Sequence, residues 1–195
     1  MKRYLTIIAA LILMSLPAAA QTLGLSYSPY GEMSIKCPDG VYYYSSSLAG
    51  GVTYEFLTDG DSIMLEGVYS VYNFDTFGSS PEHMIPLTTE NMSVMSLMAY
   101  YGWTINKRKR IQFPIYAGLG ICSFEKSPGP KTALAAGLKA RVKFYVSNRF
   151  GIFAGANASY GIFGVENSGS NQIDMYPFKP MSVEFGVMFD LLDKK

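Results

Sequence analysis

The sequence has few of the residues on which metal sites, nucleic-acid surfaces and many active sites depend. Only 16% of its residues are charged, against about 25% in typical soluble domains. The formal net charge is +1, so neither nucleic acid nor a strongly acidic partner is favoured. One histidine and two cysteines supply no clustered metal ligands, and no calcium loop or glycine-rich phosphate motif is present. We therefore expect no cofactor and no nucleic-acid partner.

Long apolar runs are also lacking after the first 20 residues. The opening stretch has a basic start, an apolar segment at 4–16 and a small-residue site at 18–20, which together indicate a signal peptide cleaved before Gln21. Residues 1–20 are then the signal peptide, and 21–195 form one domain by length. Cleavage leaves fourteen basic and fifteen acidic residues. No later run is long enough for a membrane-spanning helix.

The clearest regular pattern lies at 132–146. Every second residue from Leu134 to Val146 is apolar, and the residues between them include Lys139, Arg141 and Lys143. This period of two predicts a β-strand with one apolar and one polar face. The strand therefore contacts either lipid or a protein core on its apolar side.

Similar alternation predicts seven further strands and no helix. The expected strands are 23–34, 47–56, 62–74, 92–105, 111–124, 132–146, 150–163 and 181–192. The connections between them are alternately long and short, with the longer ones at 35–46, 75–91, 125–131 and 164–180. In an up-and-down meander the long connections share one end, as in outer-membrane barrels. The predicted fold is all-β, an eight-stranded antiparallel up-and-down transmembrane β-barrel.

Two barrel types fit this pattern, a membrane barrel with its apolar face outward and a soluble ligand-binding barrel with its apolar face inward. The polar faces contain mostly Gly, Ser, Ala, Asn and Thr, which suit a narrow lumen better than a water-exposed surface. Aromatic residues lie toward the strand ends, as interfacial girdles require. These are Tyr54, Phe56, Trp103, Phe113, Phe144 and Phe189 near the short turns, and Tyr27, Tyr69 and Tyr160 near the loops. The membrane barrel is favoured, and a soluble periplasmic barrel is the alternative.

The signal peptide, the eight alternating segments and the fifth segment, IQFPIYAGLGICSF, resemble the small outer-membrane β-barrel family that includes OmpA-barrel, OmpX-like and PorT-like proteins. The resemblance covers 21–195. It implies an outer-membrane location, contact with outer-membrane lipid, insertion by the outer-membrane assembly machinery and a monomeric barrel. Such barrels usually end on an aromatic residue, whereas this chain continues from Phe189 into DLLDKK. Phe189 or Leu191 is the expected assembly signal.

The basic side chains of 132–146 have two interpretations. They line a narrow channel for small solutes, or they form a structural ion network that fills the lumen. Eight-stranded barrels have interiors only wide enough for side chains, and buried charges persist when they are paired. We favour the network, whose expected members are Glu55, Glu66, Lys139, Arg141, Lys143, Glu184 and Asp190.

The remaining candidates for chemistry are weak. The single histidine, His83, lies between prolines in a predicted loop, a poor platform for the rigid geometry of a catalytic triad. The basic turn 106–110 either binds lipid phosphates or is simply solvated, and we favour the solvated turn. Cys37 and Cys122 fall at the same end of the barrel, so a disulfide between them is a hypothesis.

The sequence thus favours a non-enzymatic outer-membrane protein with a structural or surface-interaction role. The predicted loops are rich in Tyr, Ser, Asn and Gly, a composition suited to contacts with extracellular proteins or glycans. A narrow small-solute channel is the main alternative. A lipid-modifying enzyme is a further alternative that the lone loop histidine does not favour.

Overall fold

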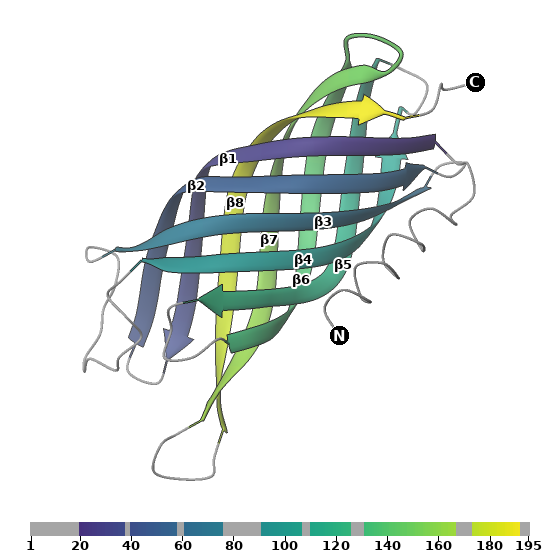
Figure 1. Ribbon diagram of the computed structural model, residues 1–195. Coiled ribbons are helices and arrows are strands. Elements are labelled where there is room, and N and C mark those ends of the chain that lie inside the picture. Colours follow the sequence, from purple (N-terminus) through teal and green to yellow (C-terminus); the bar gives the residue numbers. More distant parts are fainter. Residues whose placement is uncertain are drawn as a thin grey trace, which may run out of the picture.

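The chain forms a closed eight-stranded β-barrel in the computed structural model (Figure 1). The structure describes residues 20–37, 40–57, 61–75, 91–106, 110–125, 131–166 and 173–191. Each strand pairs antiparallel with the next, and β8 pairs with β1 to close the ring. The strands are β1 (Ala20–Cys37), β2 (Gly40–Leu57), β3 (Asp61–Asp75), β4 (Met92–Ile105), β5 (Ile111–Glu125), β6 (Lys131–Tyr145), β7 (Phe150–Glu166) and β8 (Ile173–Asp190). The predicted fold class is confirmed.

The two ends of the barrel differ in their strand lengths and connections. At one end, which we call the turn end, lie the start of β1, the end of β8 and the connections 58–60, 106–110 and 146–149. At the opposite end, the loop end, β7 and β8 run beyond the ends of the neighbouring strands (Figure 1). Within the described ranges, no helix has the length and hydrophobicity of a membrane-crossing helix.

The predicted long loops at 35–46 and 164–180 are wrong. β1 and β2 are separated only by residues 38–39, and β7 and β8 only by residues 167–172. Most of both segments therefore belongs to strands that extend the barrel at the loop end. The predicted long connection at 75–91 corresponds to residues 76–91 between β3 and β4.

Two β-bulges explain the error in the first of these segments. The pairing of β1 with β8 shifts between Tyr27 and Tyr30, and the pairing of β2 with β3 shifts between Ser45 and Leu48. An extra residue in a strand reverses the faces to which later side chains point. Apolar residues of β1 before the bulge therefore face outward, whereas those after it, such as Met33, face inward. The alternation breaks at this height, although the strand continues.

Prolines explain the error in the second segment. Pro177 and Pro180 have no N–H to donate, and proline rarely occurs inside a central strand. In the structure both lie within β8, where Pro177 is opposite Ile162 of β7 and Pro180 is opposite Met33 of β1. The pairing of the residues around them keeps the strand in place.

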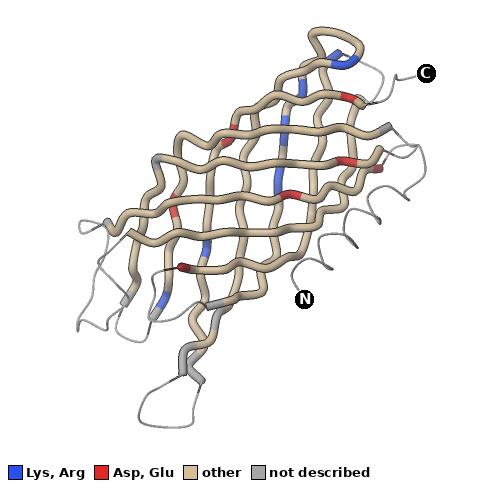
Figure 2. Tube along the Cα trace, in the orientation of Figure 1, with Lys and Arg blue, Asp and Glu red and all other residues tan. Residues whose placement is uncertain are grey.

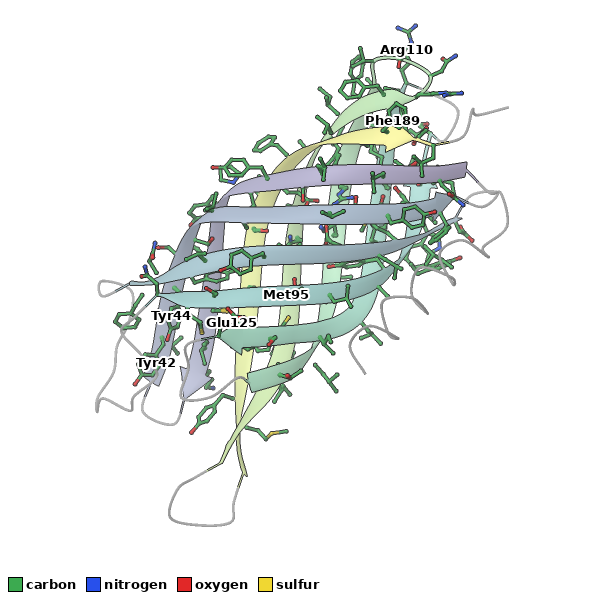
Figure 3. All side chains as sticks on the ribbon, viewed as in Figure 1. Tyr42, Tyr44, Met95, Arg110, Glu125 and Phe189 are labelled. Carbon is green, nitrogen blue, oxygen red and sulfur yellow. The ribbon has the colours of Figure 1, made fainter. Side chains whose placement is uncertain are left out.

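The outer wall of the barrel is apolar on every strand. Large apolar side chains point away from the lumen and are between 37% and 75% exposed, an arrangement that suits lipid rather than water. One example from each strand, in order, is Leu25, Val52, Leu65, Leu97, Leu119, Leu138, Ile152 and Val187. Met95 in Figure 3 marks this outward face on β4.

Aromatic side chains border the wall at both ends, as interfacial girdles do. Those near the loop end are Tyr27, Tyr69 and Tyr160, and those near the turn end are Trp103, Phe113, Phe144 and Phe189; all are 40–51% exposed. Phe56 differs, because it is only 8% exposed and packs edge-on against Tyr54 with ring centroids 4.5 Å apart. The described barrel thus has the outer surface of a membrane-embedded protein.

Candidate functional site

The candidate site is the lumen, where β6 places three basic side chains in line. Lys139, Arg141 and Lys143 alternate with outward residues such as Leu138, and each is at most 3% exposed. In Figure 2 the basic positions of β6 follow one another along the strand, and acidic positions lie on other strands of the barrel. Burial of three cations requires carboxylate partners, because an unpaired buried charge is very costly.

Two glutamates hold the central pair of bases. Lys139 Nζ lies 2.5 Å from Glu66 Oε1 and 3.1 Å from Glu184 Oε2. Arg141 donates from Nε to Glu184 Oε1 at 2.7 Å, and from Nη2 to Glu66 Oε1 at 3.0 Å. Charge-assisted bonds of this kind are the strong ones, and the planar guanidinium fixes their geometry. β3, β6 and β8 are thereby connected through the lumen.

A second pair lies closer to the turn end. Lys143 forms an ion pair with Glu55 of β2, and the same carboxylate accepts a hydrogen bond of 2.8 Å from Tyr116 Oη of β5. Glu55 is 2% exposed and Tyr116 is fully buried. This pair connects β2, β5 and β6.

Aromatic rings pack around the buried cations. The Arg141 guanidinium carbon lies 4.3 Å from the ring centroid of Phe153. Lys139 Nζ lies 5.7 Å from the ring of Tyr100, and Lys143 Nζ lies 5.8 Å from that of Tyr116. Such contacts stabilise a cation most when water is excluded. The layer of the lumen formed by Lys139, Arg141, Lys143 and their glutamate partners, which we call the charged layer, is therefore packed by side chains rather than solvated.

Asp190, the seventh predicted member, is separate from the salt bridges described above. It is fully buried at the turn end, and its Oδ1 accepts a hydrogen bond of 2.6 Å from Thr22 Oγ1 of β1. The structure thus brings the three bases together with Glu55, Glu66 and Glu184, and it places Asp190 where β8 closes the barrel against β1. The bond between these strands is a local contribution to ring closure.

The loop-end half of the lumen is apolar, which the sequence did not predict. We call its packed side chains the loop-end cluster; they include Met33, Ile35, Tyr42, Tyr44, Phe124, Tyr176 and Phe178, each at most 7% exposed. Phe124 and Phe178 meet edge-to-face with centroids 5.0 Å apart. In Figure 3 Tyr42 and Tyr44 lie near this end, far from Phe189 and Arg110. The sequence shows no alternation at Tyr42 and Tyr44, because Tyr43 lies between them, and both fall in the segment that was wrongly predicted as a loop.

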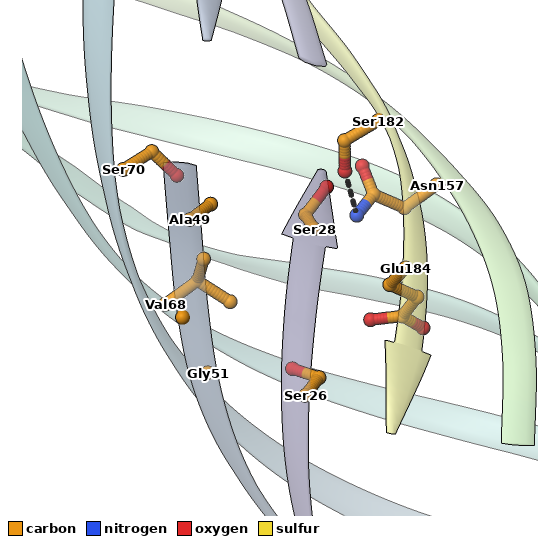
Figure 4. A pocket seen from close by; sticks show the side chains of 10 residues that line it. Ser26, Ser28, Ala49, Gly51, Val68, Ser70, Asn157, Ser182 and Glu184 are labelled. Carbon is orange, nitrogen blue, oxygen red and sulfur yellow. Dashed lines mark hydrogen bonds between the residues drawn. The ribbon is translucent and has the colours of Figure 1, made fainter. Parts of the chain in front are cut away.

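A small polar cavity lies between the charged layer and the loop-end cluster (Figure 4). Its volume is about 20 Å³, enough for one water molecule. Serine hydroxyls, the Asn157 amide and the Glu184 carboxylate line it, and Asn157 Nδ2 donates to Ser182 Oγ at 2.8 Å. Among the described residues, the buried ion pairs are followed toward the loop end by this polar cavity and then by the loop-end cluster, and a second apolar cluster of Tyr145, Phe153 and Met188 lies toward the turn end.

Other sequence candidates are only partly described. Cys122 is a buried free thiol, and the side chain of Cys37 lies outside the described residues, so the disulfide stays a prediction. His83, residues 1–19 of the predicted signal peptide and 107–109 of the basic turn also lie outside them. Among the described residues, no group of three His, Cys, Asp or Glu side chains could hold a metal ion.

A closed ring of eight antiparallel strands, with an apolar wall outside and a buried salt-bridge network inside, is the architecture of small outer-membrane β-barrels. Contact with lipid follows from this wall.

Solved structures share this fold. The chain is similar to Neisserial surface protein A, with a TM-score of 0.59 and 11% identity over 88% of this chain and 97% of that one. It is also similar to the outer membrane protein AlkL, with a TM-score of 0.58 and 8% identity over 90% and 91% of the two chains. A major outer membrane protein from Thermus thermophilus matches with a TM-score of 0.53 and 10% identity, over 89% and 100%. These identities show the fold alone.

No family model and no curated protein matches the sequence.

Proposed function

We propose that this protein is a closed, non-conducting barrel of the outer membrane with a structural or surface-interaction role. The observation that carries this proposal is the packed lumen. Six ionisable side chains joined by salt bridges fill its middle, and the loop-end cluster fills its loop end. A solute would have to displace both, and breaking a buried ion pair costs about 3–5 kcal/mol.

The strand extensions at the loop end are the proposed contact surface. Beyond the bulge in β1 the outward side chains are Tyr30, Glu32, Ser34 and Lys36, whereas Met33 and Ile35 face inward. This is the polarity of a water-exposed sheet over a protein core. The extensions therefore stand above the lipid acyl chains, and beyond the headgroups they present a rigid surface to an extracellular protein or glycan. The assembly machinery and outer-membrane lipid are the other expected partners, and the proposal assigns no catalytic activity.

Two measurements test the proposal. Purified barrel in a planar bilayer should give no stable conductance, whereas a reproducible open channel would favour the small-solute channel instead. In cells, the protein should stay in the membrane after carbonate extraction and should migrate differently on gels with and without heating. A soluble protein that is not heat-modifiable would favour the periplasmic ligand-binding barrel.

The contact role has its own test. Cells that display the barrel should bind immobilised glycans or matrix proteins more than cells without it. Tyr43→Ser, a change at an outward side chain of β2 that is 41% exposed, should reduce the binding. Equal binding by cells with and without the barrel would leave only the structural role.

A further inference from the structure

Two lysines lie together on the outside of the barrel, at the loop-end edge of the apolar wall. Lys36 of β1 and Lys179 of β8 both point outward and are exposed. Ser34 is directly opposite Lys179 in the β1–β8 pairing, so Lys36 is the next outward residue along β1. Diagonal neighbours in an antiparallel pair are about 7–8 Å apart. Two long side chains at this separation can direct both ammonium groups to one anion.

Other side chains on the outer face lie beside the lysines. Ser34 is opposite Lys179 and two residues before Lys36, and its half-buried side chain carries a hydroxyl on the same face. On the other side of β8, the Lys179 ammonium lies 5.9 Å from the ring centroid of Tyr160, so the flexible lysine side chain has to turn toward β1 for both ammonium groups to reach one anion. One acid shares this surface: Glu32, whose carboxylate accepts a hydrogen bond from Tyr30. Among the described residues, no salt bridge joins Glu32 to either lysine.

The height of the pair along the barrel matches a lipid headgroup. The outward residues of β8 from Leu191 to Met181 are apolar, and Lys179 is the next outward residue. Ten residue steps of about 3.3 Å, at a strand tilt of about 40°, span about 25 Å of membrane. Lysines at this edge extend their apolar stems along the wall and place their charge at phosphate depth, and tyrosines favour the same interface.

We propose that Lys36, Lys179 and Ser34 form a binding site for the phosphate of an anionic lipid in the leaflet at the loop end. The acyl chains of such a lipid would lie on the apolar wall directly below, on Met181 and Val183, which are 57% and 41% exposed. A soluble phosphate would gain only the polar half of these contacts. The site rests on the proposed membrane location and adds a specific lipid class to it.

Native mass spectrometry of the folded full-length barrel in detergent tests the site. Titration with phosphatidylglycerol should show one lipid bound more tightly than phosphatidylcholine. Each basic residue near a membrane surface contributes about 1 kcal/mol to the attraction of anionic lipid, which corresponds to about 5-fold in affinity. Lys36→Gln and Lys179→Gln should therefore each weaken phosphatidylglycerol binding about 5-fold, and the double variant about 30-fold.

The matched control removes the same charge from the opposite end. Arg110 and Arg149 are exposed at the turn end, and the double variant Arg110→Gln, Arg149→Gln should bind phosphatidylglycerol like the wild type. Undiminished binding by the double lysine variant, or an equal loss in the arginine control, would overturn the proposal. Heat-modifiable migration of each variant on gels establishes that the barrel is folded.

Two further measurements complete the test. The first shows whether the site binds a lipid or a soluble anion, and the second tests the membrane location separately from the lipid site. Millimolar inorganic phosphate should not displace phosphatidylglycerol; displacement would mean that the site binds a soluble anion instead. Carbonate extraction of cells tests the membrane location by itself. If the barrel is extracted as a soluble protein, the proposed function fails; if it remains in the membrane but does not distinguish the two lipids, only the lipid site fails.

Discussion

Replacing Glu184 with glutamine gives the sharpest test of a dry, ion-paired lumen. Glu184 is 3% exposed and accepts hydrogen bonds from Lys139 at 3.1 Å and from Arg141 Nε at 2.7 Å. The amide keeps the shape but loses the charge, so both cations retain only Glu66. Breaking a buried ion pair costs about 3–5 kcal/mol. We expect Glu184→Gln to lower the free energy of unfolding by that amount.

Urea unfolding of the barrel from phosphatidylcholine vesicles measures this loss. The single tryptophan, Trp103, is exposed on the outer wall, so its fluorescence reports departure from lipid. The matched control is Glu125→Gln, because Glu125 is an exposed carboxylate at the end of β5; surface changes of this kind are usually within about 0.5 kcal/mol. A cost below about 1 kcal/mol for Glu184→Gln would refute a dry network and indicate a water-filled lumen.

The balance of buried charges predicts which substitution in the ion network destabilises the barrel more. The buried charged residues among those described are four acids and three bases. Removing an acid reduces the imbalance, whereas removing a base increases it. Lys139→Met should therefore destabilise the barrel more than Glu184→Gln, although each removes two ion pairs. The reverse order in the same urea titration would show that the individual contacts outweigh the net charge.

Three further predictions follow from the wall, the packing and the cysteines. Leu138→Arg, at an outward side chain that is 63% exposed, should cost about 2–4 kcal/mol in lipid; tolerance in the urea assay would mean that this face does not contact lipid. Gly161→Ala should cost about 1–3 kcal/mol, because its Cβ would lie 2.3 Å from an aromatic ring of β8, whereas Gly50→Ala meets nothing within 4 Å and should be neutral. The hypothesis of a Cys37–Cys122 disulfide predicts that reduction shifts the gel mobility of the oxidised wild type and that Cys37→Ser abolishes this shift. A wild type whose mobility does not change on reduction would contradict the disulfide.

The part of the fold that could be predicted is the part where alternation is unbroken. β6 was expected at 132–146 and lies at Lys131–Tyr145, with its basic residues inside and Leu138 outside. A strand with one apolar and one basic face admits only one orientation in a membrane barrel. The same reasoning limited the partners of its lysines and arginine to carboxylates on the polar faces of other strands.

The particular pairings could not be read from the sequence. Whether Lys143 meets Glu55 or Glu66 depends on the stagger between β2, β3 and β6, which the alternation of a single strand does not fix. In the barrel, Lys143 pairs with Glu55, whereas Lys139 and Arg141 share Glu66. The aromatic rings around these cations were also missed, because Tyr100, on the inward face of β4, is the same residue type as its outward neighbour Tyr101.

The bulges in β1 and β2 explain both the wrong loop prediction at 35–46 and the change in what each face of these strands contacts. Ser28 pairs with Ala49 below them and Gly31 pairs with Ser46 above them, so both strands reverse their faces at one height without losing their mutual register. Below that height apolar residues face lipid; above it they face the loop-end cluster. A strand that kept its original parity would expose Met33 to water. The reversal therefore lies close to the loop-end edge of the apolar wall, and it allows one continuous pair of strands to be a membrane wall at one end and the cover of a protein core at the other.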